Sequence, residues 1–268
     1  MDQVKFLADE GFHALEDSGL RAKPVALQSR IGEELARRHM TMGLFVAVAD
    51  FARPTFASGS VDLRNAVLRE LRSAIETARR VGGRYLAVIP GKRVHALSHA
   101  LQMRHAAETL RYCADLCERH NLTLLLEPID LGADSSRLFL RTVNQAAELC
   151  RAVGRPSCRL LVDVCQQATA GHDVAMLLAQ TRDVLGYVQL GDWPGRKEPG
   201  TGDLDFARLL ALLDGLGYRG LLGMEHGKRL PGREGERALI AAYRALDEAA
   251  QRPIAASRAA ARHRSTSS

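Results

Sequence analysis

The sequence predicts an α/β fold, a (β/α)8 TIM barrel formed by one domain. Its 268 residues, 46% of them hydrophobic and 25% charged, suffice for a barrel with a large buried core. Short apolar runs alternate with segments of helical periodicity along the chain, which is typical of a parallel sheet covered by helices. Four of the later apolar runs end at a carboxylate or carboxamide, where barrel strands carry functional groups.

Seven apolar runs predict the strands. Each run is short and is bounded by segments rich in polar residues or glycine. The expected strands are residues 12–15, 42–48, 85–89, 122–126, 159–162, 185–190 and 220–224. Runs without polar residues predict strands that are buried on both faces, as in a parallel sheet.

Apolar residues at intervals of three and four predict eight helices. The expected helices are residues 4–10, 25–38, 63–80, 100–119, 137–153, 174–181, 206–216 and 235–249. Asp62 is the expected cap of the third helix, and Asp203 or Asp205 is the expected cap of the seventh. A helix between successive strands makes those strands parallel.

The predicted order begins with a helix and has one strand fewer than a closed barrel of eight. We therefore expect the first strand of the barrel to be absent from this chain. Either that strand is encoded upstream of Met1, or the barrel is open between its first and last strands.

The folded domain is expected to end near residue 250. No segment rich in Pro, Gly or Ser divides residues 1–250. Residues 251–268 are rich in Ala, Arg and Ser, which predicts a disordered basic C-terminal tail. Without the four arginines of this tail, the formal charge of +6 falls to about +2. The charge of the domain therefore gives no reason to expect a nucleic-acid partner.

The five cysteines favour a reducing compartment. Their number is odd, the chain is large enough to fold without disulfides, and no Cys-x-x-Cys pair is present. No basic segment followed by an apolar stretch begins the sequence, and no run approaches the roughly 18 apolar residues of a membrane span. We expect a cytoplasmic protein without a membrane partner, and the sequence leaves a homo-oligomer open.

Glu127, Asp163, Gln189 and Glu225 stand at the ends of four successive predicted strands. The intervals of 36, 26 and 36 residues between them each leave room for one helix. Burying a carboxylate costs free energy unless the group has a partner or a function. Since parallel barrel strands end at one rim, we expect these four side chains to meet there.

These four side chains offer only oxygen atoms to a cation, which suits Mn²⁺ or Mg²⁺ better than zinc or copper. Without a cation, three carboxylates at one rim would repel one another. Each residue alone is more simply explained as a cap or an ion-pair partner. The set of four at successive strand ends predicts the metal site.

The same segments resemble the hydroxypyruvate isomerase family, within the group of sugar isomerases and epimerases that look like xylose isomerase. The resemblance covers residues 2–249 and rests on LLLEPID, LLVDV, YVQLGDWPGRKEPGTGDLDF and GLLGMEHG, in this order. PGRKEPGTGDLDF matches the family's Gly/Asp-Arg-x-Glu-Pro-x-x-Gly-Glu/Asp loop. Gln189 stands where the ketohexose epimerases of the group have His, which favours the hydroxypyruvate isomerase branch.

The resemblance implies an intramolecular oxidoreductase of the aldose–ketose type on a xylose isomerase-like barrel. It implies conversion of hydroxypyruvate to tartronate semialdehyde through an enediolate. A cation acting as a Lewis acid would stabilise the developing oxyanion. Glu127 and Glu225 would be the proton-transfer pair, one removing a proton and the other returning one to the neighbouring carbon.

Three further residues are predicted to contact the substrate. Arg196 lies in the loop after the sixth predicted strand, where its guanidinium can bind a carboxylate. Gln166 replaces the His of the family's Asp-x-Tyr/Phe-His-x-Gln segment, and it cannot gain a proton near neutral pH. Lys228 follows the last predicted strand at the rim. Glu198 is expected to pair with Arg196 or Lys197 and so to order the loop.

Other functions stay open on the same fold. A sugar or sugar-acid epimerase, or a dehydratase acting on inososes, would begin with the same abstraction of an α-proton. A barrel that binds a ligand without turnover would explain Gln166 and the missing strand. A DNA-repair nuclease of this barrel group would need several His at the strand ends, whereas this sequence has Gln and Glu there.

Overall fold

Parallel strands form the main sheet of the computed structural model, which describes residues 2–130, 132 and 137–265. In this part of the chain the main sheet consists of β3 (Leu44–Ala49), β4 (Tyr85–Ile89), β5 (Thr123–Leu126), β6 (Cys158–Asp163), β7 (Leu185–Leu190) and β8 (Leu222–Met224). The strands pair in chain order and in parallel. The carboxyl ends of all these strands therefore lie at one rim.

A shorter pair of strands continues this arrangement at its N-terminal side. β1 (Ala14–Leu15) pairs in parallel with β2 (Thr41–Met42), and only Gly43 separates β2 from β3. The described residues thus provide seven strand positions in sequence order, with β1 at one end and β8 at the other. This arrangement confirms the predicted TIM-barrel type of fold and its seven predicted strands.

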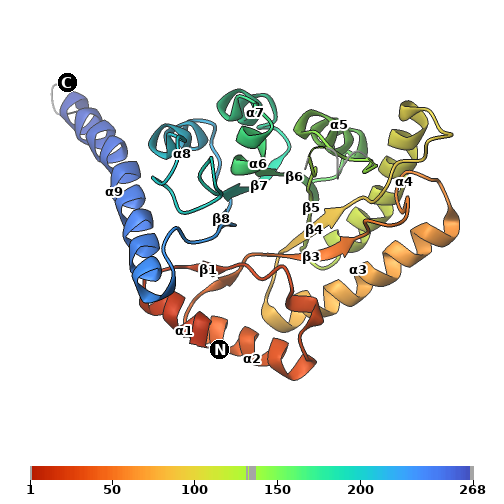
Figure 1. Ribbon diagram of the computed structural model, residues 1–268, viewed down its shortest axis with the longest axis horizontal. Coiled ribbons are helices and arrows are strands. Elements are labelled where there is room, and N and C mark those ends of the chain that lie inside the picture. The colour runs from red at the N-terminus through yellow and green to blue at the C-terminus, as the bar shows by residue number, and fades with distance from the viewer. Residues whose placement is uncertain (1, 131, 133–136, 266–268) are drawn as a thin grey trace.

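The helices cover the outer side of the curved sheet (Figure 1). Within the described residues they are α1 (Asp2–Asp9), η1 (Leu20–Ala22), α2 (Val25–Arg37), α3 (Val61–Val81), α4 (His99–Glu118), α5 (Val143–Val153), α6 (Val164–Thr169), α7 (Val174–Gln180), α8 (Phe206–Gly215) and α9 (Gly232–Ser265). No helix among the described residues is both long and apolar enough to cross a membrane.

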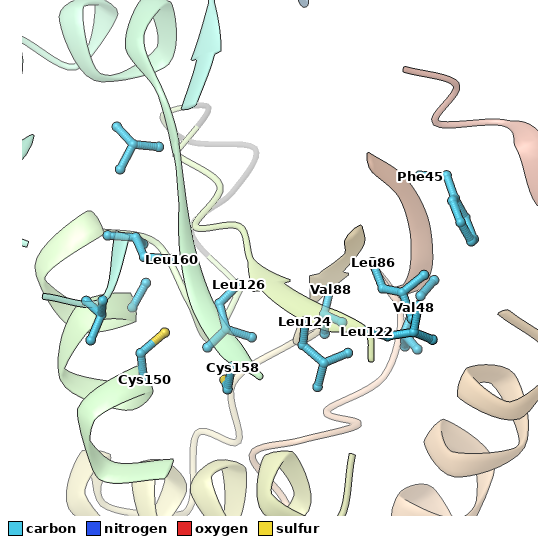
Figure 2. Packing of buried hydrophobic residues seen from close by; sticks show 14 of the residues in the cluster. Phe45, Val48, Leu86, Val88, Leu122, Leu124, Leu126, Cys150, Cys158 and Leu160 are labelled. Carbon is cyan, nitrogen blue, oxygen red and sulfur yellow. The ribbon is translucent and has the colours of Figure 1, made fainter. Parts of the chain in front are cut away.

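Two apolar layers follow from the alternation of side chains along each strand. The larger layer lies between the strands and the helices, and Figure 2 shows part of it, including Phe45, Leu86, Leu124, Cys150 and Leu160. The smaller layer fills the inside of the curved sheet and contains Leu44, Ala87, Leu125, Leu161 and Tyr187. A strand residue an even number of positions after one of these interior residues also faces inward.

The sheet is open between β1 and β8. Among the described residues, no strand pairs with the outer edge of either one. A cavity of about 790 Å³ lies at this opening, which we call the seam. Its wall includes Phe6 from α1, Leu44 from β3, Met224 from β8 and Ile240 from α9. Strand-end carboxylates line the same cavity, so the seam leads to the predicted site.

Several element boundaries differ from the predictions. The helix expected from residue 137 begins at Val143, because the Thr142 side chain accepts a hydrogen bond from the Gln145 N–H and caps the helix there. Ser60, and not Asp62, caps α3. α6 was not predicted, since its six residues are too few to show a helical period. Asp205 does cap α8.

α9 continues through residues that the sequence assigns to a disordered tail and ends at Ser265. It extends away from the rest of the molecule in Figure 1. The domain boundary near residue 250 stays a prediction.

Candidate active site

Three of the four predicted cation ligands face the interior of the barrel because of their positions in the strands. The interior apolar layer contains Leu125, Leu161 and Tyr187. The predicted ligands that follow these residues by two positions are Glu127, Asp163 and Gln189. Strand alternation therefore directs all three side chains to the inner rim.

Asp163 and Gln189 lie directly beside each other, because they are partners in the register of β6 and β7. Both are 3% exposed. The Asp163 carboxylate also caps α6 by accepting a hydrogen bond of 2.9 Å from the Gln166 N–H. The Gln189 Oε1 atom is buried, and no described residue gives it a hydrogen bond.

The Arg196 guanidinium lies between two of the predicted ligands. Its Nη2 atom donates to Asp163 Oδ2 and to Glu225 Oε2, each at 2.6 Å. The two carboxylates, from the ends of β6 and β8, are thus close enough to share one cationic group. Arg196 was predicted to bind a substrate carboxylate, and here it binds two carboxylates of the protein.

Asp192 shapes the loop that carries Arg196. This carboxylate is fully buried and accepts five backbone N–H groups, at distances of 2.8–3.2 Å. The donors are Trp193, Gly200, Thr201, Gly202 and Leu204. Glu198, the predicted partner of Arg196 or Lys197, instead accepts the backbone N–H of Arg229. The expected pairing is wrong. The loop is held mainly by Asp192, which lies just after the end of β7.

Glu16 is a site residue that was not predicted. Its carboxylate accepts hydrogen bonds from the Tyr187 hydroxyl at 2.5 Å and from Gln189 Nε2 at 3.3 Å. Gly223 leaves room for it, because a Cβ atom there would lie 1.7 Å from Glu16 Oε1. The sequence contained the signal, since Glu16 directly follows the predicted strand 12–15 just as Glu127 follows its own strand.

Burial raises the pKa of three carboxyl groups in the site. Burial, with the nearby charges of Glu225 and Asp163, raises the pKa of Glu127 to about 8. Burial also raises the pKa of Glu225, against the opposing charge of Arg196. For Glu16, burial outweighs the two hydrogen bonds that favour the charged form. Without a bound cation, burial therefore favours the protonated form of Glu127, which is the form of a general acid.

The two other predicted substrate contacts, Gln166 and Lys228, line two different cavities. Gln166 is 8% exposed, and its Oε1 atom has no hydrogen-bond partner in the described part of the chain. It lines a second cavity, of about 740 Å³, together with Arg196 and Thr169. Lys228 lines the cavity at the seam, where its ammonium group binds Glu236 at 3.1 Å. Each residue therefore borders space that a ligand can enter.

The donors suit a hard divalent cation in type and in number. Asp163 and Glu225 already share one cationic nitrogen, and Gln189 Oε1 is a buried acceptor that lacks a donor. As the side chains stand, however, no group of three or more His, Cys, Asp or Glu residues in the described chain is arranged to hold an ion. The donor set fits, and the guanidinium of Arg196 separates two of its members.

The comparisons with known proteins identify the family of this chain. The family model described as "Xylose isomerase-like TIM barrel" matches residues 4–249. A putative hydroxypyruvate isomerase of Mus musculus is 30% identical over 232 residues, which are 82% of this chain and 84% of that protein. A 2-oxo-tetronate isomerase of Cupriavidus necator is 27% identical over 239 residues, which are 85% and 87% of the two chains.

Solved structures share the fold at lower sequence identity. An AP endonuclease, family 2, from Brucella melitensis has a TM-score of 0.74 and 23% identity, covering 87% of this chain and 90% of its own. The IolI protein with a bound zinc atom has a TM-score of 0.72 and 16% identity, covering 93% and 92%. The chain belongs to the xylose isomerase-like TIM-barrel family, and it is an enzyme of the isomerase class like its hydroxypyruvate isomerase and 2-oxo-tetronate isomerase relatives.

Proposed function

We propose that the protein is a metal-dependent isomerase of small hydroxy-keto acids that converts hydroxypyruvate to tartronate semialdehyde. The observation that carries this proposal is the meeting of Asp163 and Glu225 on one cationic nitrogen, beside Gln189. This arrangement can hold two adjacent oxygen atoms of an α-hydroxy carbonyl next to groups that transfer protons. The 2-oxo-tetronate isomerase relative favours a four-carbon keto acid as the second candidate substrate.

Glu127, Asp163, Gln189 and Glu225 would hold the cation, Mn²⁺ or Mg²⁺. When bound, such an ion supplies Lewis-acid polarisation of the substrate's carbonyl and hydroxyl oxygens. The all-oxygen donor set supports one of these two ions over zinc. The IolI structure with zinc supports metal binding on this fold in general.

Glu127 and Glu225 would transfer the protons. One carboxylate removes a proton from the hydroxymethyl carbon of hydroxypyruvate, and the electron pair forms an enediolate. The other, as a carboxylic acid, delivers a proton to the former carbonyl carbon. The proton of the former hydroxyl group passes to the former carbonyl oxygen, so that no atom is lost or gained. The raised pKa values of both groups support this exchange of acid and base roles.

Arg196, Gln166 and Lys228 would position the substrate. Arg196 offers a planar pair of donors to the substrate carboxylate, and Gln166 offers a buried carboxamide to a hydroxyl group. Lys228 adds a positive charge at the seam. We further propose a cytoplasmic location, which five free cysteines support.

Proton NMR in D₂O tests the proposal. EDTA-treated protein is given hydroxypyruvate, 2-oxo-tetronate or a ketose, with and without added Mn²⁺. We expect deuterium incorporation and isomer formation with a keto acid only when Mn²⁺ is present. We also expect Glu225→Gln to slow the reaction by about 100-fold or more.

Exchange of a ketose but of neither keto acid would replace this proposal by an epimerase. Loss of water from an inosose would indicate a dehydratase. The absence of exchange with every substrate, in protein that binds Mn²⁺, would favour a barrel that binds a ligand without turnover.

A further inference from the structure

The guanidinium of Arg196 takes the place that an ion shared by Asp163 and Glu225 would take. One nitrogen, Nη2, contacts both carboxylates at 2.6 Å. Asp163 is 3% exposed, and a carboxylate so deeply buried is costly without a positive partner. A cation cannot bind these two oxygens while the same nitrogen remains between them.

Gln189 shows that Arg196 satisfies this centre only in part. Its Oε1 atom is buried on β7, beside Asp163, without a hydrogen bond from any described residue. A guanidinium donates only along its fixed N–H directions, whereas a divalent cation accepts oxygen ligands from several sides. A cation could therefore bind the Gln189 Oε1 atom, which Arg196 leaves without a partner.

The backbone of Arg196 is held in place, so its side chain is the part that would have to move to free the two carboxylates. Its carbonyl accepts the N–H of Gly227 at 3.0 Å, and Asp192 binds both ends of the loop. Arg196 also lines the cavity of about 740 Å³ beside Gln166. The guanidinium thus has space next to it, on the side where a substrate carboxylate would bind.

We propose that Arg196 and the divalent cation compete for Asp163 and Glu225, and that cation binding moves the guanidinium into the cavity beside Gln166. This inference rests on the proposed function for the presence of a cation. It orders the events, because Arg196 becomes available to an acidic substrate only after the cation has taken its carboxylates. It also predicts that Arg196 lowers the affinity of the protein for the cation.

Binding of Mn²⁺, followed by the electron paramagnetic resonance of the free ion, tests the competition without any measurement of activity. The full chain, stripped with EDTA, is compared with Arg196→Met and with Lys197→Met. Because two charge-assisted hydrogen bonds no longer have to be broken, we expect Arg196→Met to bind Mn²⁺ at least about tenfold more tightly. Lys197→Met removes the same charge one residue away, and we expect a change of less than about twofold.

A second measurement uses the Arg196→Ala variant. Millimolar guanidinium chloride should weaken its Mn²⁺ binding more than sodium chloride of the same concentration does, because the added ion can enter the vacated position. In the unchanged protein, the two salts should affect Mn²⁺ binding equally. This comparison is made within one variant, so it does not depend on equal folding of two proteins.

Equal Mn²⁺ affinity of the unchanged protein and Arg196→Met would overturn the inference. Equal tightening in Lys197→Met would also overturn it, since the effect would then be one of general charge. If no form binds Mn²⁺, the inference fails together with the metal dependence of the proposed function. If Mn²⁺ binds with the expected competition but no keto acid exchanges, the proposed function fails and the inference stands.

Discussion

At the scale of single residues, the chemistry of the site depends on carboxylates that are kept from water. Glu127 is the clearest example, because burial and two neighbouring acids raise its pKa from 4.5 to about 8. The same burial makes its charge unfavourable for folding when no cation is present. The acid that suits proton transfer is therefore also a source of pH-dependent stability.

Glu127 should make the metal-free protein less stable as the pH rises. The folded state binds this proton more tightly than the unfolded state, whose pKa is near 4.5. The contribution of the group to stability is therefore complete below about pH 4.5 and is lost as the pH rises toward 8. The measurement is thermal unfolding of EDTA-treated protein between these pH values. The midpoint temperature of Glu127→Gln should fall less steeply with rising pH than that of the unchanged protein.

Glu234→Gln is the matched control for this measurement, because Glu234 is exposed on α9. Its unfolding midpoints should follow those of the unchanged protein at every pH. An equally steep decline in Glu127→Gln would show that another group causes the dependence.

At the scale of elements, the loop between β7 and α8 is organised by the residue that follows the strand almost directly. The buried Asp192 carboxylate accepts N–H groups from both ends of the loop. The conformation includes Arg196 at a φ of 51°, in the left-handed region that side chains disfavour. The Gly227 N–H, which the Arg196 carbonyl accepts, and the hydrogen bonds of the loop to Asp192 hold this backbone in place.

Asp192→Asn should disrupt the loop although the two side chains have the same shape. The amide would set N–H donors against the N–H groups of the loop, which costs about 1–3 kcal/mol for a buried unsatisfied group. We expect a lower midpoint in urea unfolding and weaker Mn²⁺-dependent activity. Asp205→Asn is the control, because Asn caps a helix about as well as Asp does, and its midpoint should stay the same.

An unchanged midpoint in Asp192→Asn would mean that the loop does not depend on this carboxylate. A lower midpoint with unchanged activity would mean that the loop is stabilised by Asp192 but does not position Arg196.

At the scale of the whole molecule, residues from the two ends of the chain meet across the seam. Glu16, after β1, lies against Gly223 of β8, and it binds Gln189 and Tyr187 of β7. These side-chain contacts connect the first and last strand positions, although no backbone hydrogen bonds join β1 and β8 in the described chain. The inner rim is therefore completed by side chains where the sheet is open.

Gly223→Ala tests this contact. The new Cβ would lie 1.7 Å from Glu16 Oε1 and 2.6 Å from its Cδ, so the carboxylate must leave its position. We expect loss of stability by about 1–3 kcal/mol and a reaction slowed by about tenfold or more. The double variant with Glu16→Ala should regain part of the stability, which urea unfolding can measure.

Gly215→Ala in α8 is the control, because no atom lies within 4 Å of its added Cβ. Alanine is favoured over glycine in a helix, so this variant should be at least as stable as the unchanged protein. Gly223→Ala with unchanged stability and activity would show that Glu16 is not held at this place.

The sequence alone determined the order of the strands and the residues at their carboxyl ends. β4 and β7 have the predicted bounds, because a short apolar run between turn residues identifies a buried strand from local information. The placement of Glu127, Asp163 and Gln189 at one rim follows from that order and from strand alternation. The metal and the proton-transfer roles of these residues remain proposals.

Only the tertiary structure decided which polar side chains meet. Glu16 reaches Gln189 across 173 residues, and Arg196 lies between Asp163 and Glu225. No local pattern encodes such contacts, because they depend on how the curvature of the sheet brings strand ends and one loop together. The sequence specifies the groups at the rim through short-range periodicity, whereas their partners and their pKa values depend on burial and distance in the folded chain.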